Sequence, residues 1–142
     1  MKKVFFLALL MIQLANSSFA QAQDEKEILK ILSDQTASWN KGDYEGFMKG
    51  YWNNDSLMFV GKTSVTYGYQ NTLTHYKETY NTADKMGKLF FEILKVKKLS
   101  GEYFFVLGKW FLKRNSGDIG GHYTLLFRKI NGKWLIICDH SS

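Results

Sequence analysis

Two short segments decide how this chain folds: Trp39-Asn40-Lys41-Gly42-Asp43 and, shortly afterwards, Trp52-Asn53-Asn54-Asp55-Ser56-Leu57-Met58-Phe59. The first segment predicts the end of one helix and the start of another. Gly42 can adopt the left-handed backbone that closes a helix, and Asp43 can cap the helix that follows. The second segment predicts a turn that leads into a first short strand at Ser56–Val60.

Apolar residues recur at helical spacing on both sides of these turns. Asp24 and Glu27 form a capping-box-like pair, which predicts that the first helix of the domain begins at Asp24. Three helices are predicted in total, and a polar loop that we expect to be mobile follows at Asn81–Gly87. The predicted buried stripes are Ile28, Ile31, Leu32, Gln35 and Trp39; Tyr44, Phe47, Met48 and Tyr51; and Tyr69, Leu73, Tyr76 and Tyr80.

The second half of the chain has the pattern of long strands. Turn residues separate them, and Asn131-Gly132 between two apolar runs is the strongest hairpin signal in the chain. Helices followed by a meander of antiparallel strands predict an α+β fold, with three N-terminal helices packed on a curved antiparallel sheet. The predicted strands are Leu89–Leu99, Glu102–Arg114, Ile119–Ile130 and Lys133–His140.

The turns also predict which side chains share a sheet face, provided that no strand contains a bulge. Both predicted faces are largely apolar, so we expect the helices to cover one face and a second copy of the chain to cover the other, as a homodimer. One extra residue in a strand would exchange the faces and void this assignment. The predicted rows are Phe91, Trp110, Tyr123 and His140 on one face, and Glu92, Lys109, Thr124 and Asp139 on the other.

Residues 1–22 have the features of a secretory signal peptide. Lys2 and Lys3 precede the apolar run Val4–Ile12, and Ala20-Gln21-Ala22 offers small residues at a cleavage site. The apolar run is shorter than the roughly 20 residues that a membrane-spanning helix needs. The sequence therefore predicts an exported protein, periplasmic or secreted, with one domain at residues 23–142 and no membrane attachment after cleavage.

Charge, cysteine and histidine content narrow the choice of partners. The net charge of +6 includes the two lysines of the leader, so the domain carries about +4, and its basic residues are scattered. We therefore expect no nucleic-acid partner. Cys138 is the single cysteine, so an intrachain disulfide is impossible. The three histidines show no metal-ligand spacing, and we expect neither a metal nor a cofactor.

Three groups of residues resemble the nuclear transport factor 2-like superfamily, which includes ketosteroid isomerase and the SnoaL-like polyketide cyclases. They are Asn40-x-Gly42-Asp43, Asp55-Ser56, and the ending Trp134-x-Ile136-x-x-Asp139-His140-Ser141-Ser142. The resemblance covers essentially all of residues 24–142. It implies a cystatin-like cone built around a pocket, and members of the superfamily differ mainly in what that pocket holds.

The catalytic residues of ketosteroid isomerase have no counterparts here. By the resemblance, the general-base aspartate corresponds to Val60, the oxyanion-binding tyrosine to Gln35, and the second aspartate to Gly121–Tyr123, where no carboxylate exists. A protein that lacks the base and both oxyanion donors loses several orders of magnitude in rate. The chain is therefore not expected to be a steroid isomerase of the known type.

The aromatic residues of the chain and His140 predict a binding pocket for a small apolar molecule, lined by aromatic side chains with a few polar groups. Two alternatives stay open: an enzyme of the cyclase, dehydratase or isomerase kind that uses His140 as its proton carrier, and a dimerisation or protein-interaction module. The candidate ligand-binding residues are Trp39, Trp52, Tyr67, Trp110, Tyr123 and His140.

Overall fold

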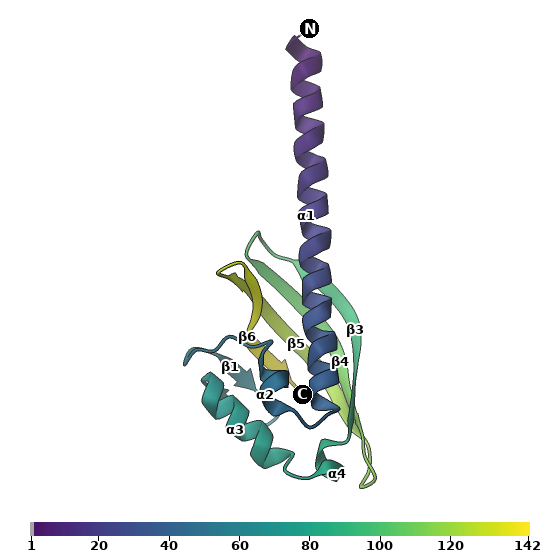
Figure 1. Ribbon diagram of the computed structural model, residues 1–142, viewed down its shortest axis with the longest axis vertical. Helices are drawn as coiled ribbons and strands as arrows, with labels where there is room; N and C mark the ends of the chain where they lie inside the picture. Colours follow the sequence, from purple (N-terminus) through teal and green to yellow (C-terminus); the bar gives the residue numbers. More distant parts are fainter. Residues whose placement is uncertain (1) are drawn as a thin grey trace.

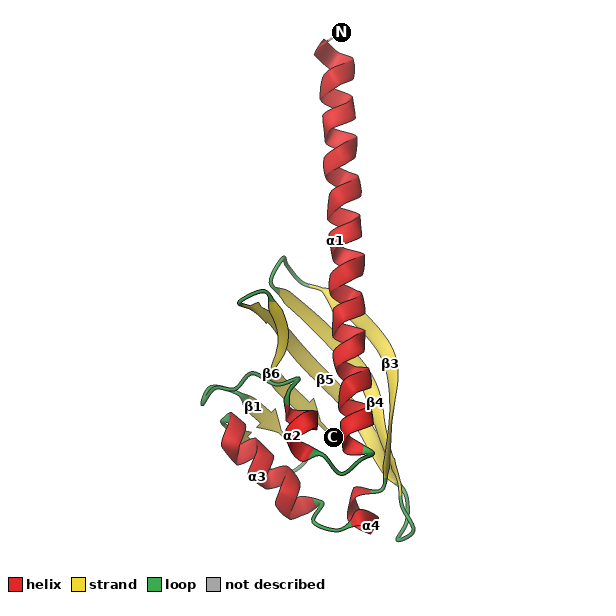
Figure 2. Cartoon of the chain, viewed as in Figure 1, coloured by secondary structure: helices red, strands yellow, loops and turns green. Residues whose placement is uncertain are grey.

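The computed structural model describes residues 2–142, with side-chain surroundings from Phe19 onward. Within this range the elements follow in the order α1-α2-β1-β2-α3-α4-β3-β4-β5-β6. The helices pack against a curved sheet of six strands (Figure 1, Figure 2), which confirms the predicted α+β class.

The first helix, α1, runs continuously over Lys2–Trp39. Its early part extends beyond the end of the sheet (Figure 1), and Asp24 is the first buried residue among the described side chains. The predicted stripe is confirmed, since Ile28, Leu32 and Trp39 are buried. The prediction that the helix begins at Asp24 is wrong for the full chain, because α1 is already helical before that residue.

The predicted boundary between residues 22 and 23 falls inside α1, and it stays a prediction. Among the residues that the structure describes, none of the helices combines the length and the apolar character that crossing a membrane requires.

The turn after α1 has the predicted form. Gly42 has a φ of 77°, which an L side chain rarely adopts, and the Asp43 carboxylate accepts a hydrogen bond from the Gly46 N–H at 2.8 Å. The short helix α2, Tyr44–Met48, begins there and buries Phe47 and Met48. This turn lets α2 fold back against α1.

A small hairpin follows α2. The strand β1, Met58–Val60, was predicted, whereas its antiparallel partner β2, Val65–Tyr67, was not. A three-residue strand with two exposed side chains lacks the hydrophobic alternation that sequence reading depends on.

Two helices connect this hairpin to the main sheet. The predicted third helix is α3, Tyr69–Thr79. The prediction of a mobile loop at Asn81–Gly87 is wrong in part, because α4, Ala83–Met86, forms within it. The Thr82 hydroxyl caps α4 by accepting a hydrogen bond from the Lys85 N–H, and burial of Met86 anchors the turn to the core.

The four long strands are β3, Lys88–Lys98, β4, Tyr103–Lys113, β5, Ile119–Ile130, and β6, Lys133–Ser141. They form the predicted antiparallel meander, and β1 joins its β6 edge in parallel, which gives the order β2-β1-β6-β5-β4-β3. At the predicted hairpin between β5 and β6, Asn131 and Gly132 both have positive φ, the geometry that Asn-Gly favours.

The predicted rows of side chains are corrected by the strand register. In the pairing of β5 with β6, Leu126 lies opposite Cys138 but Phe127 lies opposite Ile136, so Ile137 is an extra residue in β6. Beyond this bulge the side chains of β6 change faces. Asp139 therefore points to the inner face, which the helices cover, and His140 lies on the outer face, the reverse of the prediction.

A second shift affects β4 and β5. Tyr123 lies opposite Gly108, and Trp110 lies opposite Gly121 rather than opposite Tyr123 as predicted. The displacement is two residues, so Trp110 and Tyr123 still share the inner face. The predicted pairs of β3 with β4, Phe91 with Trp110 and Glu92 with Lys109, are confirmed.

Candidate functional site

A cavity of about 80 Å³ lies between the helices and the inner face of the sheet. Its walls are mainly aromatic and come from α1, α2, α3 and the sheet. The aromatic residues on the helices, directly after α3, and on β1 and β3 are Trp39, Phe47, Phe59, Tyr76, Tyr80 and Phe91.

Trp39 is the centre of the aromatic wall. Its ring makes edge-to-face contacts with Phe47, Tyr76 and Tyr80, with centroid distances of 5.1, 5.8 and 4.9 Å. Its indole N–H donates to the Met86 carbonyl at 3.0 Å. Because this indole already has a partner, Trp39 offers a ligand only apolar surface.

The polar part of the cavity centres on Asp139, which is 4% exposed. The Tyr51 hydroxyl donates to Asp139 Oδ2 at 2.6 Å, and the Ser141 hydroxyl donates to Oδ1 at 3.0 Å. Tyr51 is also 3.3 Å, oxygen to oxygen, from the hydroxyl of Tyr76. The carboxyl group is thus held by two hydroxyl donors, one from β6 and one from the segment after α2, and Tyr76 of α3 contacts the second of these.

Burial raises the pKa of Asp139 from its ordinary 3.8 to about 6, and the two hydroxyl donors and the nearby His140 offset only part of this rise. The pKa values of Tyr51 and Tyr76 lie well above 10, first because both phenols are buried and also because Asp139 is close. The site therefore holds one group, Asp139, that could take up or release a proton near neutral pH.

Two donors in this cavity have no partner. Trp110 Nε1 and the Tyr123 hydroxyl are both buried, and neither makes a hydrogen bond. Burying a polar group without a partner costs free energy, so such groups are rare in native proteins. Both residues line the cavity, and Tyr123 is only 3% exposed.

Two glycines make room for these rings. A Cβ on Gly108 would lie 2.4 Å from the Tyr123 hydroxyl oxygen, and a Cβ on Gly121 would lie 3.2 Å from Trp110 Nε1. Each ring thus lies over the glycine opposite it on the neighbouring strand. Glycine at position 108 is what lets the Tyr123 hydroxyl lie close to the sheet, whereas glycine at position 121 first makes room for the Ser142 carbonyl.

The structure brings together three of the six predicted site residues. Trp39, Trp110 and Tyr123 line the cavity. Trp52 is half-buried outside it, Tyr67 is 58% exposed at the end of β2, and His140 is exposed on the outer face of β6.

Sequence reasoning did not identify Tyr51, Asp139 and Ser141 as cavity residues, and it did not connect Tyr76 with Asp139. The two tyrosines were predicted to be buried, but nothing in the sequence joins them to Asp139, which lies far away along the chain. Among the residues that the structure describes, no cluster of three or more histidine, cysteine or acidic side chains could hold a metal ion.

Comparison with known proteins found no matching family model and no matching curated protein. Solved structures do match. A protein of unknown function from Shewanella oneidensis, described as NTF-2 like, is 38% identical over 84% of this chain and 98% of its own, with a TM-score of 0.80. An NTF2-like protein of unknown function from Pseudomonas putida is 16% identical over 85% of this chain and 87% of its own, with a TM-score of 0.71.

A domain of unknown function with a cystatin-like fold, from Nostoc punctiforme, is 16% identical over 84% of this chain and 78% of its own. Its TM-score is 0.71. Because the identity is low, the similarity to this domain concerns the fold alone. The similarity to the Shewanella protein reaches further, because identity and coverage are both high. The chain therefore belongs to the nuclear transport factor 2-like (NTF2-like) family.

Proposed function

We propose that this protein is an exported binding protein for a small, largely apolar molecule, which it holds in the cavity beneath Trp39. The observation that carries the proposal is the pair of unpartnered buried donors, Trp110 Nε1 and the Tyr123 hydroxyl, inside a mainly aromatic cavity. A binding site needs this composition, since apolar walls supply affinity and a few polar atoms fix orientation.

A thermal-shift screen against a panel of apolar and carboxylate compounds tests this proposal. We expect some compounds to raise the melting temperature of the wild type, because a ligand that binds only the folded state stabilises it. Phe91→Trp fills part of the cavity and is expected to abolish the shift, whereas Tyr67→Trp, at an exposed position at the end of β2, is the matched control. The proposal fails if no compound stabilises the protein, or if both variants respond like the wild type.

Catalysis is the second candidate, and the observation that favours it is the carboxyl of Asp139 with a pKa of about 6 in the cavity. In that case Asp139, rather than the outward-facing His140, carries the proton. Turnover of a bound compound that vanishes in Asp139→Asn and persists in His140→Ala would identify an enzyme.

Export rests on the leader at residues 1–22, and two features of α1 support it. Phe19, next to the expected cleavage site, is 78% exposed, and packing begins at Asp24, just after the site. The buried contacts that begin at Asp24 therefore belong to the part of the chain that remains after cleavage. We infer a periplasmic or secreted location for the processed protein.

A second copy of the chain is proposed to cover the outer sheet face. On that face Phe90 and Phe111 are paired across β3 and β4, with ring centroids 6.5 Å apart, and they are 54% and 41% exposed. Leu94, the extra residue in β3, is 42% exposed. Apolar side chains gathered on one exposed face are typical of protein–protein contacts.

One purified sample tests export and dimerisation together. When the full chain is expressed in a bacterium with a periplasm, we expect the protein in the periplasmic fraction to begin within a few residues of Gln23, as read by mass spectrometry. Light scattering should give a molar mass twice that of the processed chain. For Phe111→Asp the molar mass should fall to that of a single chain. An uncleaved N-terminus contradicts export, and a monomeric wild type contradicts the dimer.

A further inference from the structure

We propose that the ligand of this cavity is a compact, uncharged carbonyl compound, whose oxygen accepts hydrogen bonds from the indole N–H of Trp110 and the hydroxyl of Tyr123. This inference rests on the proposed binding function and names the chemical class that the site selects. The atoms that carry it are two donors which the protein buries and leaves without a partner.

The two donors lie on neighbouring strands of the same face. Trp110 is opposite Gly121 and Tyr123 is opposite Gly108, so the two rings are diagonal neighbours across β4 and β5. An indole N–H can only donate, and a phenol that lacks an acceptor also donates. Each of these donors lacks an acceptor, and a carbonyl oxygen, which has two lone pairs, can accept from both.

The charge of the cavity selects among acceptor groups. Its lining contains no lysine, arginine or histidine, and Asp139 is the one carboxyl group in it. A carboxylate ligand would be buried beside Asp139 without a cation, which is strongly unfavourable. The carbonyl oxygen of a ketone, ester or amide accepts the same two hydrogen bonds without bringing a charge.

An ammonium ligand fits less well, although Asp139 and the aromatic walls would attract a cation. Both oxygens of Asp139 already accept hydrogen bonds, from Tyr51 and from Ser141. A cation also offers no acceptor to Trp110 Nε1, so this buried donor would remain without a hydrogen bond.

The cavity volume sets the size of the ligand. At about 80 Å³ it is smaller than the roughly 150 Å³ cavity that takes up benzene, so it holds a compound with fewer non-hydrogen atoms than benzene. Butanone and propanamide have this size. Propanoate and propylammonium have nearly the same shape and carry a negative and a positive charge.

Nuclear magnetic resonance of the indole N–H groups tests the proposal directly. The chain has four tryptophans, and the Trp110→Phe spectrum assigns the Trp110 signal. We expect butanone and propanamide to shift the Trp110 signal saturably, since a new hydrogen bond forms there. The Trp134 indole, which already donates to Asp24, should not move. Propanoate and propylammonium should leave both signals unchanged at neutral pH.

Matched variants separate the hydrogen bonds from general packing. Tyr123→Phe keeps the ring and removes the donor, and we expect it to weaken binding of the neutral probes about fivefold, the value of one hydrogen bond. Tyr103→Phe, on the outer face of β4, is the control and should bind like the wild type. Because the Tyr123 hydroxyl has no partner, its removal leaves the hydrogen bonds of the fold intact.

Each outcome decides the matter. Saturable shifts by the neutral probes that weaken in Tyr123→Phe support the proposal. Binding of propanoate or propylammonium in their place overturns the ligand class but keeps the binding function. If no small probe binds while another compound gives a thermal shift that Phe91→Trp abolishes, the carbonyl proposal fails alone. If nothing binds in either experiment, both proposals fail, and the two donors form hydrogen bonds with water instead.

Discussion

The stability of the wild type relative to Asp139→Asn is expected to fall by about 3 kcal/mol as the pH rises from about 3 to about 7. The cause is the buried carboxyl of Asp139, whose pKa rises from the ordinary 3.8 to about 6. Since a tenfold change in proton affinity corresponds to about 1.4 kcal/mol, a rise of this size corresponds to about 3 kcal/mol.

The sign follows from proton binding. Between the two pKa values, the folded protein holds the Asp139 proton more tightly than the unfolded chain does. Folding is therefore helped at low pH, and this help is lost as the pH rises through the window. Above about pH 6 the folded state must keep a carboxylate in a cavity whose lining has no cation, with Tyr51 and Ser141 as its donors.

Urea denaturation of the wild type and Asp139→Asn at a series of pH values checks this prediction. Other groups titrate too, so the informative quantity is the difference in unfolding free energy between the two proteins. Asp55→Asn, at an exposed aspartate, is the matched control. A difference that stays constant across the window would mean that Asp139 titrates as in water.

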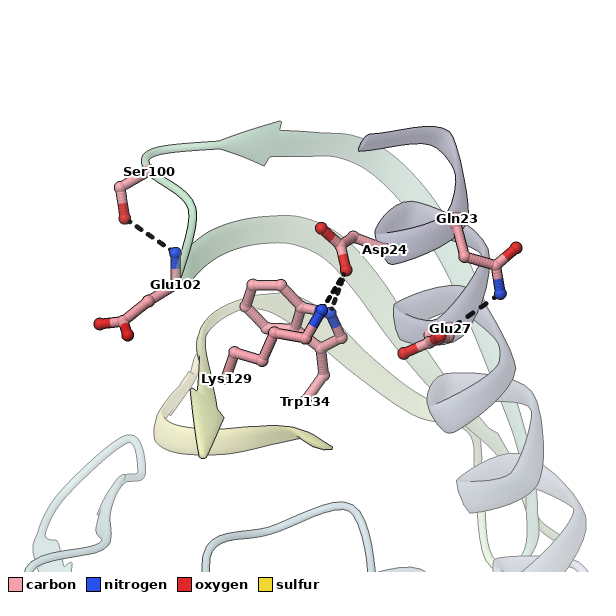
Figure 3. Close-up of polar contacts among 7 residues, drawn as sticks. All are labelled: Gln23, Asp24, Glu27, Ser100, Glu102, Lys129 and Trp134. Atoms are coloured by element: carbon pink, nitrogen blue, oxygen red, sulfur yellow. Dashed lines mark hydrogen bonds and ion pairs between the residues drawn. The ribbon is translucent and has the colours of Figure 1, made fainter. Parts of the chain in front are cut away.

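Replacing Asp24 with alanine is expected to destabilise the protein by about 2 kcal/mol, because hydrogen bonds to charged groups contribute about 1.5–3 kcal/mol. The Asp24 carboxylate accepts hydrogen bonds from the Lys129 ammonium at 2.8 Å and from the Trp134 indole at 2.9 Å (Figure 3). It thereby ties the first packed turn of α1 to β5 and β6. Without it, the buried indole of Trp134 loses its acceptor.

The pH response of Asp24 is opposite to that of Asp139. Burial alone would raise its pKa, but the hydrogen bonds from Lys129 and Trp134 outweigh burial and hold the pKa below 3.8. Its contribution is therefore present above the ordinary pKa and is lost as the pH falls below about 4.

Denaturation midpoints of Asp24→Ala and Asp34→Ala give a direct comparison. Asp34 pairs with Lys30 on the solvent side of the same helix, where both side chains are more than half exposed. Exposed pairs contribute little, so Asp34→Ala should cost much less. Equal losses in the two variants would show that the contacts of Asp24 with Lys129 and Trp134 add nothing.

Much of the fold could be predicted because it depends on local patterns. The stripe of Ile28, Leu32 and Trp39 follows the period of a helix, and Gly42 and Asn131-Gly132 mark places where the backbone takes positive φ. The small elements escaped prediction because β2 and α4 are too short for a period to appear. Their stability comes from pairing with β1 and from burial of Met86.

The candidate site could be predicted only in part. Trp39, Trp110 and Tyr123 were expected at a pocket because they are aromatic, but the sequence did not tell which face of the sheet lines that pocket. The assignment of His140 failed with the bulge at Ile137. Both faces of β6 are apolar before the bulge, so hydrophobic alternation gives no sign of an extra residue.

The sequence by itself determined α1, α2 and α3, the four long strands and the turns between those strands, because each depends on interactions among near neighbours. Only the tertiary structure decided that Asp139 rather than His140 faces the cavity, and that Tyr51 and Tyr76 meet it there. One extra residue in a strand reverses every side chain beyond it. Its position is set by how β6 pairs with β5 and β1, and no local pattern records it.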